Sequence, residues 1–524
     1  MKRKRLFILA ALFPVLQLMQ AQTSYEAAAL LDTELNGTSR FVGMGGAMSA
    51  LGADMSTMST NPAATALYRR WDVALSYGGH WKTTDTHSNK GAGRAFNSYR
   101  GLDNVGTVIA NQKSNTDILR FINFGFNYRN VQRLGGKMVM NGVLDGLSQT
   151  EQMALQALGN GNVDASFFDP LAEANVFDRP NEHYVDARYG WLTLLGAQAH
   201  LMGLTSQKLD DGSVENGAWC IDSKDCEYSE SLYGGIDAYD FNLSFNILDA
   251  IYLGATFTTY DVDRAVESVY NETFDNGIYI LKNFYRTVGT GYDFKFGAIV
   301  RPFSESSFRV GLSVATPTVY SLCDLNSAII ESCVSYAMHT IDTFGEEGYG
   351  DDYTTKYTMV SPGRCNVSLG GTIGKSWAFG AEYEYIDYGR IKLYDDLGNA
   401  YYPMNEHADA CFKGKHTLRL GVEKCFSSFY TRLGYNFQTG GYSKEAFKMI
   451  PVQSVQTNTA FANINSTSNY TCGIGYRGDV FYADASLLYN VQKADFYPFD
   501  ESALQPVLLR CNNVKGALTL GMRF

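Results

Sequence analysis

The sequence predicts an all-β protein, a transmembrane antiparallel β-barrel of about 14 strands with an N-terminal hatch plugging the lumen and some helical outer loops. The chain has 35 tyrosines, 31 phenylalanines and 51 glycines but only 11 prolines, which suits many strands and tight turns. Strand-like stretches of alternating apolar and polar residues recur from about residue 71 to the C-terminus. Short turns alternate with long polar loops between them, as in outer-membrane barrels.

Residues 1–21 are predicted to be a secretory signal peptide. Positions 2 to 5 are basic, an apolar stretch runs from Leu6 to Leu16, and Ala21 offers a small residue for cleavage. This apolar stretch is too short to span a membrane. We therefore divide the chain into a signal peptide (1–21), an N-terminal segment that forms the hatch (22–70), and a transmembrane β-barrel (71–524), leaving the exact cleavage position open.

The charge and the scattered ligand-type residues exclude several classes of function. The formal net charge of −11 becomes −15 when the four basic residues of the signal peptide are removed, which argues against nucleic-acid binding. The seven histidines are scattered and no cysteine pair has C-x-x-C spacing, so we predict no metal site and no cofactor. No segment after the signal peptide reaches 18 consecutive apolar residues.

The alternation is clearest in residues 123–128. Phe124, Phe126 and Tyr128 fall on one face of this predicted strand, and asparagine and glycine fall on the other. An outer-membrane barrel needs such a pattern, with apolar side chains toward lipid, polar ones toward the lumen and aromatic residues at the interfaces. It must also close, because an open sheet edge in lipid leaves backbone groups without partners. The same pattern recurs in residues 239–246, 292–298, 377–385, 418–423 and 470–477.

The boundaries of the strands follow from the alternation and the turns. The predicted strands start near residues 71, 105, 117, 230, 251, 284, 306, 355, 376, 413, 428, 466, 480 and 512. Long polar loops are predicted over residues 131–228, 265–282, 322–352, 394–412 and 440–464.

The longest loop contains two helical stretches. Ser148 and Glu151 have the spacing of a capping box and precede an apolar run. Residues 189–204 form a second, mostly apolar stretch rich in leucine and alanine. Two alternatives stay open for them: packed helices that cap the barrel, or an apolar vestibule that collects a hydrophobic ligand.

The charged and sulfur-containing residues indicate structural roles. Glu382 and Glu384 share a lumenal face and are predicted to pair with lumenal arginines such as Arg364 and Arg419. The chain has no Gly-x-Ser-x-Gly or similar arrangement, so we predict no enzymatic activity and no catalytic residue. Nine cysteines leave at least one thiol unpaired, and local bridges are left open for two pairs, Cys220 with Cys226 and Cys323 with Cys333.

Residues 40–63 are unusually rich in small residues. They include Gly43, Gly45 and Gly46, and they end on Asn61-Pro62-Ala63. Composition alone favours a glycine-rich surface loop, since glycine lets the backbone turn tightly. Within a closed barrel, however, this stretch belongs in the lumen. We therefore predict that six residues of this stretch form the hatch and gate: Gly43, Gly45, Gly46, Asn61, Pro62 and Ala63.

Three stretches resemble the FadL-type outer-membrane transporters. They are Gly43–Ala47 with Asn61–Ala63, the block 289–317, and residues 382–388 together with the C-terminal strand. That strand ends on Phe524, which resembles the signal read by the bacterial barrel assembly machinery. One departure is Ala64, where the family commonly has glycine after Asn-Pro-Ala.

The resemblance implies a fourteen-stranded barrel in a Gram-negative outer membrane. It also implies that long-chain fatty acids or aromatic hydrocarbons bind in the lumen and leave sideways through a gap in the wall. The partners would be a hydrophobic small molecule and outer-membrane lipids, and the barrel would be a monomer. No ligand-binding residue is transferred from the family. Two other functions stay open: a structural barrel that anchors or shuttles surface proteins, and a diffusion porin.

Overall fold

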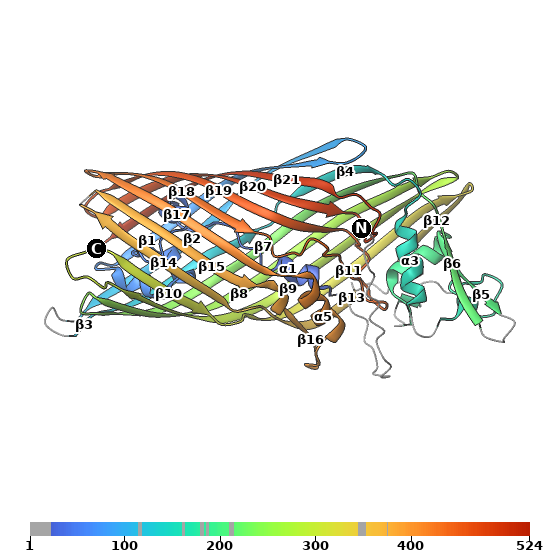
Figure 1. Ribbon diagram of the computed structural model, residues 1–524, viewed down its shortest axis with the longest axis horizontal. Coiled ribbons are helices and arrows are strands. Elements are labelled where there is room, and N and C mark those ends of the chain that lie inside the picture. The colour runs from blue at the N-terminus through green and yellow to red at the C-terminus, as the bar shows by residue number, and fades with distance from the viewer. Residues whose placement is uncertain are drawn as a thin grey trace.

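The computed structural model describes residues 22–113, 118–159, 163–178, 183–184, 188–208, 214–343, 353–374 and 376–524. The predicted signal peptide lies outside the described residues. The chain forms one large antiparallel barrel, with helices inside one end of it and across the other (Figure 1).

The barrel has 14 strands and is closed, because the first strand pairs with the last along its whole length. Four of these strands are interrupted and carry two labels each: β3 with β4, β10 with β11, β13 with β14, and β15 with β16. In chain order the strands are β1 (Asp72–His87), β2 (Ala92–Gln112), β3 (Leu119–Arg133), β4 (Lys137–Val143), β7 (Asp225–Ile247), β8 (Ile251–Phe274), β9 (Gly277–Val300), β10 (Arg309–Ala315), β11 (Val319–Val334), β12 (Ala337–Asp342), β13 (Tyr353–Val360), β14 (Arg364–Ile373), β15 (Trp377–Asp387), β16 (Lys392–Asp395), β17 (Gly414–Phe426), β18 (Phe429–Thr439), β19 (Phe461–Arg477), β20 (Phe481–Tyr497) and β21 (Val507–Arg523), where β12 extends the sheet beside β11.

The outer face carries a band of exposed apolar side chains at the end of the barrel where the C-terminus lies (Figure 1). On β1 the band includes Val73, Leu75 and Tyr77, and on β21 it includes Leu518 and Leu520. Large apolar side chains in water are costly, whereas the same side chains suit lipid. This end of the barrel is therefore the membrane-spanning part.

The strands continue well beyond this apolar band, which corrects two of the predicted loops. On β8 the outward side chains after the band are Asp261, Asp263 and Glu267. Residues 265–282 are not a loop but the ends of β8 and β9, and β11 with β12 covers much of 322–352. Likewise, β2 begins at Ala92 rather than near residue 105. The prediction was wrong here because it sought an apolar outer face, which a strand in water does not need.

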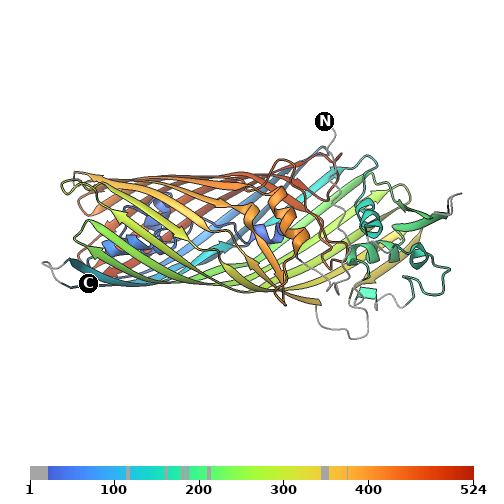
Figure 2. The ribbon, with the colours of Figure 1, turned by 60° about the horizontal axis from the view of Figure 1, so that its bottom comes forward.

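The N-terminal segment lies inside the barrel, with residues 39–67 in the membrane-spanning part and residues 24–29 further along the lumen toward the other end (Figures 1 and 2). It contains α1 (Ser24–Ala29), α2 (Ser39–Gly43), and the 3₁₀ turns η1 (Met55–Ser59) and η2 (Pro62–Leu67). All of these elements except α1 begin with a side-chain cap: Thr38 accepts the amide of Phe41 and Asp54 accepts that of Ser56, for example. Such caps satisfy backbone donors that short helices leave free.

The opposite end carries an outer cap, which consists of α3 (Gln149–Leu158), η3 (Ala165–Phe168) and α4 (Trp191–Gln198), with the hairpin of β5 (Met202–Lys208) and β6 (Val214–Cys220) beside it. Ser148 is the N-cap of α3, as predicted. All eight residues of α4 are buried, and the Thr193 hydroxyl donates to the Met153 carbonyl at 3.0 Å. The helices thus pack into a shared apolar core, as the capping alternative predicts. Two further elements, η5 (Tyr388–Arg390) and α5 (Tyr402–Cys411), lie between β15 and β17.

Candidate functional site: a lumenal cavity beside a break in the wall

The N-terminal segment touches the wall of the barrel through glycines on both sides of the contact. A Cβ atom added to Gly380, Gly421 or Gly434 would overlap the backbone of residues 44–47. These three glycines are direct partners on adjacent strands, so they form one continuous lumenal row. Wall glycines that face the N-terminal segment in this way are here called the glycine belt: Gly106, Gly125, Gly254, Gly297, Gly311, Gly370, Gly380, Gly421, Gly434 and Gly473.

The structure places Gly43, Gly45, Asn61, Pro62 and Ala63 against this belt, and Gly46 beside Arg419 of the wall. Gly45 and Gly46 have φ angles of +63° and +80°, which favour glycine, and Gly43 lies against Gly473. Asn61 caps η2 by accepting the amide of Ala63 at 3.0 Å, and Pro62 is the first residue of that turn. The Ala64 carbonyl accepts the amide of Ala53 at 3.2 Å, so the departure from the family pattern leaves this turn hydrogen-bonded.

An ion-pair network also ties the N-terminal segment to the wall. Arg40 donates to both carboxylate oxygens of Glu423, at 3.0 and 3.1 Å. Glu423 lies 2.6 Å from Arg432, which in turn lies 2.6 Å from Asp484. The Arg432 side chain is fully buried. Paired charges of this kind are stable in a closed lumen because each has a partner of opposite sign.

Glu382 and Glu384 share one arginine, which supports a structural role for them. Arg419 lies 2.6 Å from Glu382 and 3.3 Å from Glu384. Glu382 also accepts the backbone amide of Ser49 at 3.3 Å, which adds a contact with the N-terminal segment. The pairing with Arg419 is confirmed. Arg364 instead lies 3.6 Å from Asp293 of β9, across the intervening strand β10.

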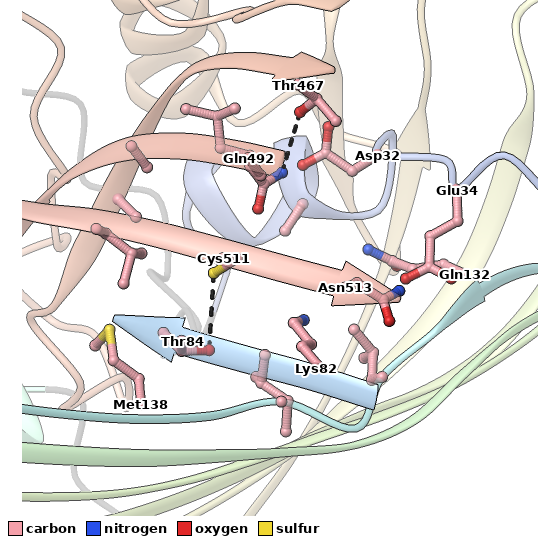
Figure 3. A pocket seen from close by; sticks show the side chains of 18 of the residues that line it. Asp32, Glu34, Lys82, Thr84, Gln132, Met138, Thr467, Gln492, Cys511 and Asn513 are labelled. Carbon is pink, nitrogen blue, oxygen red and sulfur yellow. Dashed lines mark hydrogen bonds between the residues drawn. The ribbon is translucent and has the colours of Figure 1, made fainter. Parts of the chain in front are cut away.

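A cavity of about 300 Å³ occupies the lumen beside the N-terminal segment (Figure 3). Part of its lining is apolar: Met138, Leu232, Phe461, Ile464, Ala494, Phe496 and Leu509. Another part is formed by uncharged amide side chains: Gln132, Gln438, Asn458, Asn469, Asn490, Gln492 and Asn513. Its volume is at the lower end of the range for small-molecule sites, roughly 300–1,000 Å³.

Charged groups also line the cavity, and most of them have partners. Lys415 lies 2.9 Å from Asp32, and Lys515 lies 3.0 Å from Asp103. Burial raises the pKa of the Glu34 carboxyl group. Removal from water disfavours the charged form of a carboxyl group.

The wall beside the cavity is interrupted between β2 and the β3–β4 strand. β2 pairs with β3 only over Asn104–Gln112, and β4 pairs with β7 only. Residues 92–103 of β2 therefore lack a strand partner on this side within the described chain. Residues 134–136 separate β3 from β4, and Leu134 and Gly136 line the cavity.

Side chains rather than a backbone ladder close this interruption. The Asn97 amide donates to the Gly135 carbonyl at 2.8 Å, and the Tyr99 hydroxyl donates to the Arg133 carbonyl at 3.2 Å. The Tyr99 ring lies over Gly135 and stacks on the His80 ring, with centroids 4.6 Å apart. We call this interruption, closed by Asn97 and Tyr99, the wall gap. A gap that side chains close can open when those side chains change rotamer. Strands joined by a ladder of backbone hydrogen bonds cannot separate in this way.

Other kinds of site were sought in the described residues. None of the helices there is long and apolar enough to cross a membrane. The same residues contain no cluster of three or more potential metal ligands. All nine cysteines are free thiols, so neither Cys220 with Cys226 nor Cys323 with Cys333 forms a bridge. The last pair lies on one strand, β11, and cannot meet.

No protein-family model matches the sequence, and the comparison with curated proteins returned no match. Solved structures do match. The TodX monoaromatic hydrocarbon channel (deltaS2 mutant) is 11% identical with a TM-score of 0.50, over 94% of this chain and 100% of that chain. A Pseudomonas aeruginosa FadL homologue is 10% identical (TM-score 0.49), and the Pseudomonas putida toluene transporter TodX is 10% identical (TM-score 0.48); each match covers 94% of this chain and 99% of the other. At such low sequence identity the match shows similarity of fold only.

The closed antiparallel barrel with its apolar outer band defines an outer-membrane protein of a Gram-negative bacterium. Within that class, the strand count and the match over nearly the whole chain identify the FadL-type fold.

Sequence reasoning missed the cavity and the glycine belt. Both carried a signal in the sequence. Asparagine or glutamine occupies lumenal positions on four successive strands, β18 to β21, and on β18, β19 and β21 glycine occupies a lumenal position nearer the membrane. The alternation alone assigns these positions to the lumen without saying which residues meet across strands, since that depends on register.

Proposed function

We propose that this protein moves hydrophobic small molecules, such as long-chain fatty acids or aromatic hydrocarbons, across the outer membrane by release through its wall. The observation that carries the proposal is the position of the cavity, which is lined by Leu134 and Gly136 of the wall gap. Below it lies the N-terminal segment, packed against the glycine belt. A ligand in the cavity would therefore have a shorter route through the wall than along the axis.

Release through the wall suits an apolar ligand. Each buried CH₂ group contributes about 0.8 kcal/mol to the preference for apolar surroundings. A watery pore would oppose passage by that amount, whereas a step from an apolar cavity wall into lipid would not. The aromatic ring of Tyr99 at the wall gap offers an apolar surface along this step.

We assign the N-terminal segment to the role of a plug that stays in place. Its backbone is in direct contact with wall glycines, and Arg40 is held by Glu423. Moving it would break these contacts together, whereas opening the wall gap would break a few side-chain hydrogen bonds, those of Asn97 and Tyr99 and that of Arg133 to the Leu102 carbonyl. The wall gap is thus the better candidate for the moving part than Gly43, Gly45 or Gly46.

The test is uptake of labelled fatty acids and small aromatic hydrocarbons by cells that carry or lack the gene. The proposal expects faster uptake of at least one class in cells that carry it. Equal uptake of both classes would contradict it. Unchanged uptake together with loss of a surface protein would favour the anchoring alternative, and open conductance in planar bilayers would favour a diffusion porin.

A further inference from the structure

One wall of the cavity is a hydrogen-bonding surface that an apolar ligand would leave unused. Asn469, Asn490 and Asn513 are direct partners on β19, β20 and β21. A second row, Thr467 with Gln492, lies beside the first. Figure 3 shows Gln492, Cys511 and Asn513 projecting from neighbouring strands into the same space. Amide rows of this kind present donors and acceptors at regular spacing.

Several polar atoms of this surface have no partner although they are buried. Asn513 is only 9% exposed, and its Oδ1 atom has no hydrogen bond. The Oε1 atom of Gln132 is unpartnered as well. His80 is 2% exposed, and its Nε2 atom also lacks a partner, while its Nδ1 lies 3.2 Å from the Asn513 amide nitrogen. Two further lining atoms, Glu26 Oε2 and Arg264 Nε, also have no partner. Buried polar atoms are normally satisfied, so these five unpartnered atoms in one cavity lining indicate that a ligand binds here.

The chemistry of these atoms restricts the ligand. Asn513 Oδ1 and Gln132 Oε1 are acceptors and require a donor. His80 accepts the Asn513 amide at Nδ1, so Nε2 carries the proton and requires an acceptor. A hydrocarbon offers neither function, and a carboxylate offers only acceptors. A hydroxyl group offers both.

The charged residues of the lining do not change this conclusion. Lys82 and Arg264 line the cavity and the Arg264 Nε atom has no hydrogen-bond partner, which taken alone would favour an anionic head group. Glu34 and Glu230, however, line the same cavity and act electrostatically on these two cations. The unpartnered acceptors have no such compensation in the protein.

The opposite side of the cavity is apolar, with Phe461, Ile464 and Phe496 among its residues. We propose that the cavity binds a neutral amphiphile, with a head group that carries several hydroxyl groups against the amide rows and a single hydrocarbon chain against the apolar side. This inference names a ligand class for the cavity. Transport of such a ligand across the membrane rests on the proposed function, whereas its binding in the cavity does not.

The test uses four probes with the same C12 chain: dodecyl glucoside, 1-monolauroylglycerol, laurate and dodecane. Binding is measured by equilibrium dialysis against the full mature protein in lipid nanodiscs, with empty nanodiscs as the reference. The two hydroxylated probes are expected to bind at least about ten-fold more tightly than laurate and dodecane. Tighter binding of laurate, or equal binding of all four probes, would overturn the inference.

Two variants test whether the amide rows cause the preference for hydroxylated probes. Asn513→Leu and Gln492→Met keep the size of the side chain and remove the amide, so they should lose most of the preference for hydroxylated probes and keep the binding of dodecane. Asn512→Leu, on the outer face of the same strand, is the matched control and should leave the preference unchanged. A preference that survives in both cavity variants would contradict the assignment.

The two proposals fail separately. Fatty-acid uptake by cells without any preference for hydroxylated probes would remove this inference and leave the proposed function. A clear preference in nanodiscs without uptake of any of the four probes by cells would remove the proposed transport and leave the binding site.

Discussion

At the scale of single residues, the glycine belt explains how a backbone segment fits inside a 14-strand barrel. Every lumenal side chain takes space that the N-terminal segment needs, and glycine takes the least. The belt glycines Gly380, Gly421 and Gly434 face the backbone of residues 44–47 directly. The close contact between the wall and the N-terminal segment therefore depends on glycine at individual positions of the wall.

A first prediction follows for Gly434. A Cβ atom there would overlap the backbone of Gly45, so Gly434→Ala should lower the free energy of unfolding by about 1–3 kcal/mol. The measurement is the temperature at which the folded barrel loses its heat-modifiable mobility on gels. Gly516→Ala is the control, because the nearest atom to its added Cβ is Trp81 at 3.7 Å, an ordinary contact. An equal effect of both variants would contradict the steric explanation.

A second prediction concerns Arg432, which is buried between Glu423 and Asp484 at 2.6 Å from each. Arg432→Met should destabilise the barrel by about 3–5 kcal/mol, since it leaves buried carboxylates with fewer partners. Arg286→Met is the matched control: its pair with Asp263 is about half exposed, and such pairs contribute about 0–1 kcal/mol. Denaturant unfolding in detergent measures both, and a loss below about 1 kcal/mol for Arg432→Met would count against the network.

At the scale of elements, the wall gap is the weakest seam between neighbouring strands. β2 and β3 separate after Asn104, and beyond that point side chains make the contacts. An interruption of β-strand pairing removes backbone hydrogen bonds that a closed barrel otherwise supplies. The seam lies where Tyr77 and Trp81 end the apolar band of β1, so it opens near the outer surface of the membrane.

We expect Tyr99→Ala to speed the uptake of hydrophobic compounds several-fold, because the Tyr99 ring fills the wall gap over Gly135. Entry of a hydrophilic antibiotic should not change, since the N-terminal segment stays in place. Tyr233→Ala is the control: this exposed tyrosine on β7 has its hydroxyl on Glu267, away from the wall gap. Uptake that is the same in Tyr99→Ala and wild type would show that the gap is not on the route.

The outer cap should respond to acid through one histidine pair. The His200 and His339 rings are 4.4 Å apart, and burial, followed by the neighbouring His339, lowers the pKa of His200 below its usual range. The folded cap then binds protons less readily than the unfolded chain, so its stability is full at high pH and falls as pH drops below about 6.5. The protection factors of the α4 amides, which correct hydrogen exchange for its intrinsic pH dependence, should be lower at pH 5 than at pH 7.5, and His339→Gln should reduce this difference. An equal difference in that variant would exclude the pair as the cause.

At the scale of the whole molecule, different parts of the chain lie at the two ends of the barrel. The N-terminal segment fills the membrane-spanning end, and the outer cap covers the other (Figure 2). The cavity and the wall gap lie between them. This arrangement favours a route through the side of the barrel over one along its axis.

Deletion of residues 40–63 is expected to raise the leakage of hydrophilic antibiotics and to abolish selective uptake of hydrophobic compounds. The physical reason is that the glycine belt then faces an open lumen. Antibiotic sensitivity of cells measures leakage, and heat-modifiable mobility confirms that the barrel has folded. Unchanged leakage in a folded variant would mean that this stretch is not a plug.

The sequence by itself determined the fold class, the approximate strand count, the cap of α3 at Ser148 and the pairing of Glu382 with Arg419. These features depend on local periodicity, on capping chemistry and on neighbouring strands, which a sequence records directly. Only the tertiary structure decided the length of β8 and β9 beyond the membrane, the partner of Arg364, the glycine belt, the cavity and the wall gap. Each of these depends on the register between strands far apart in the chain, and register is set by the closure of the barrel as a whole.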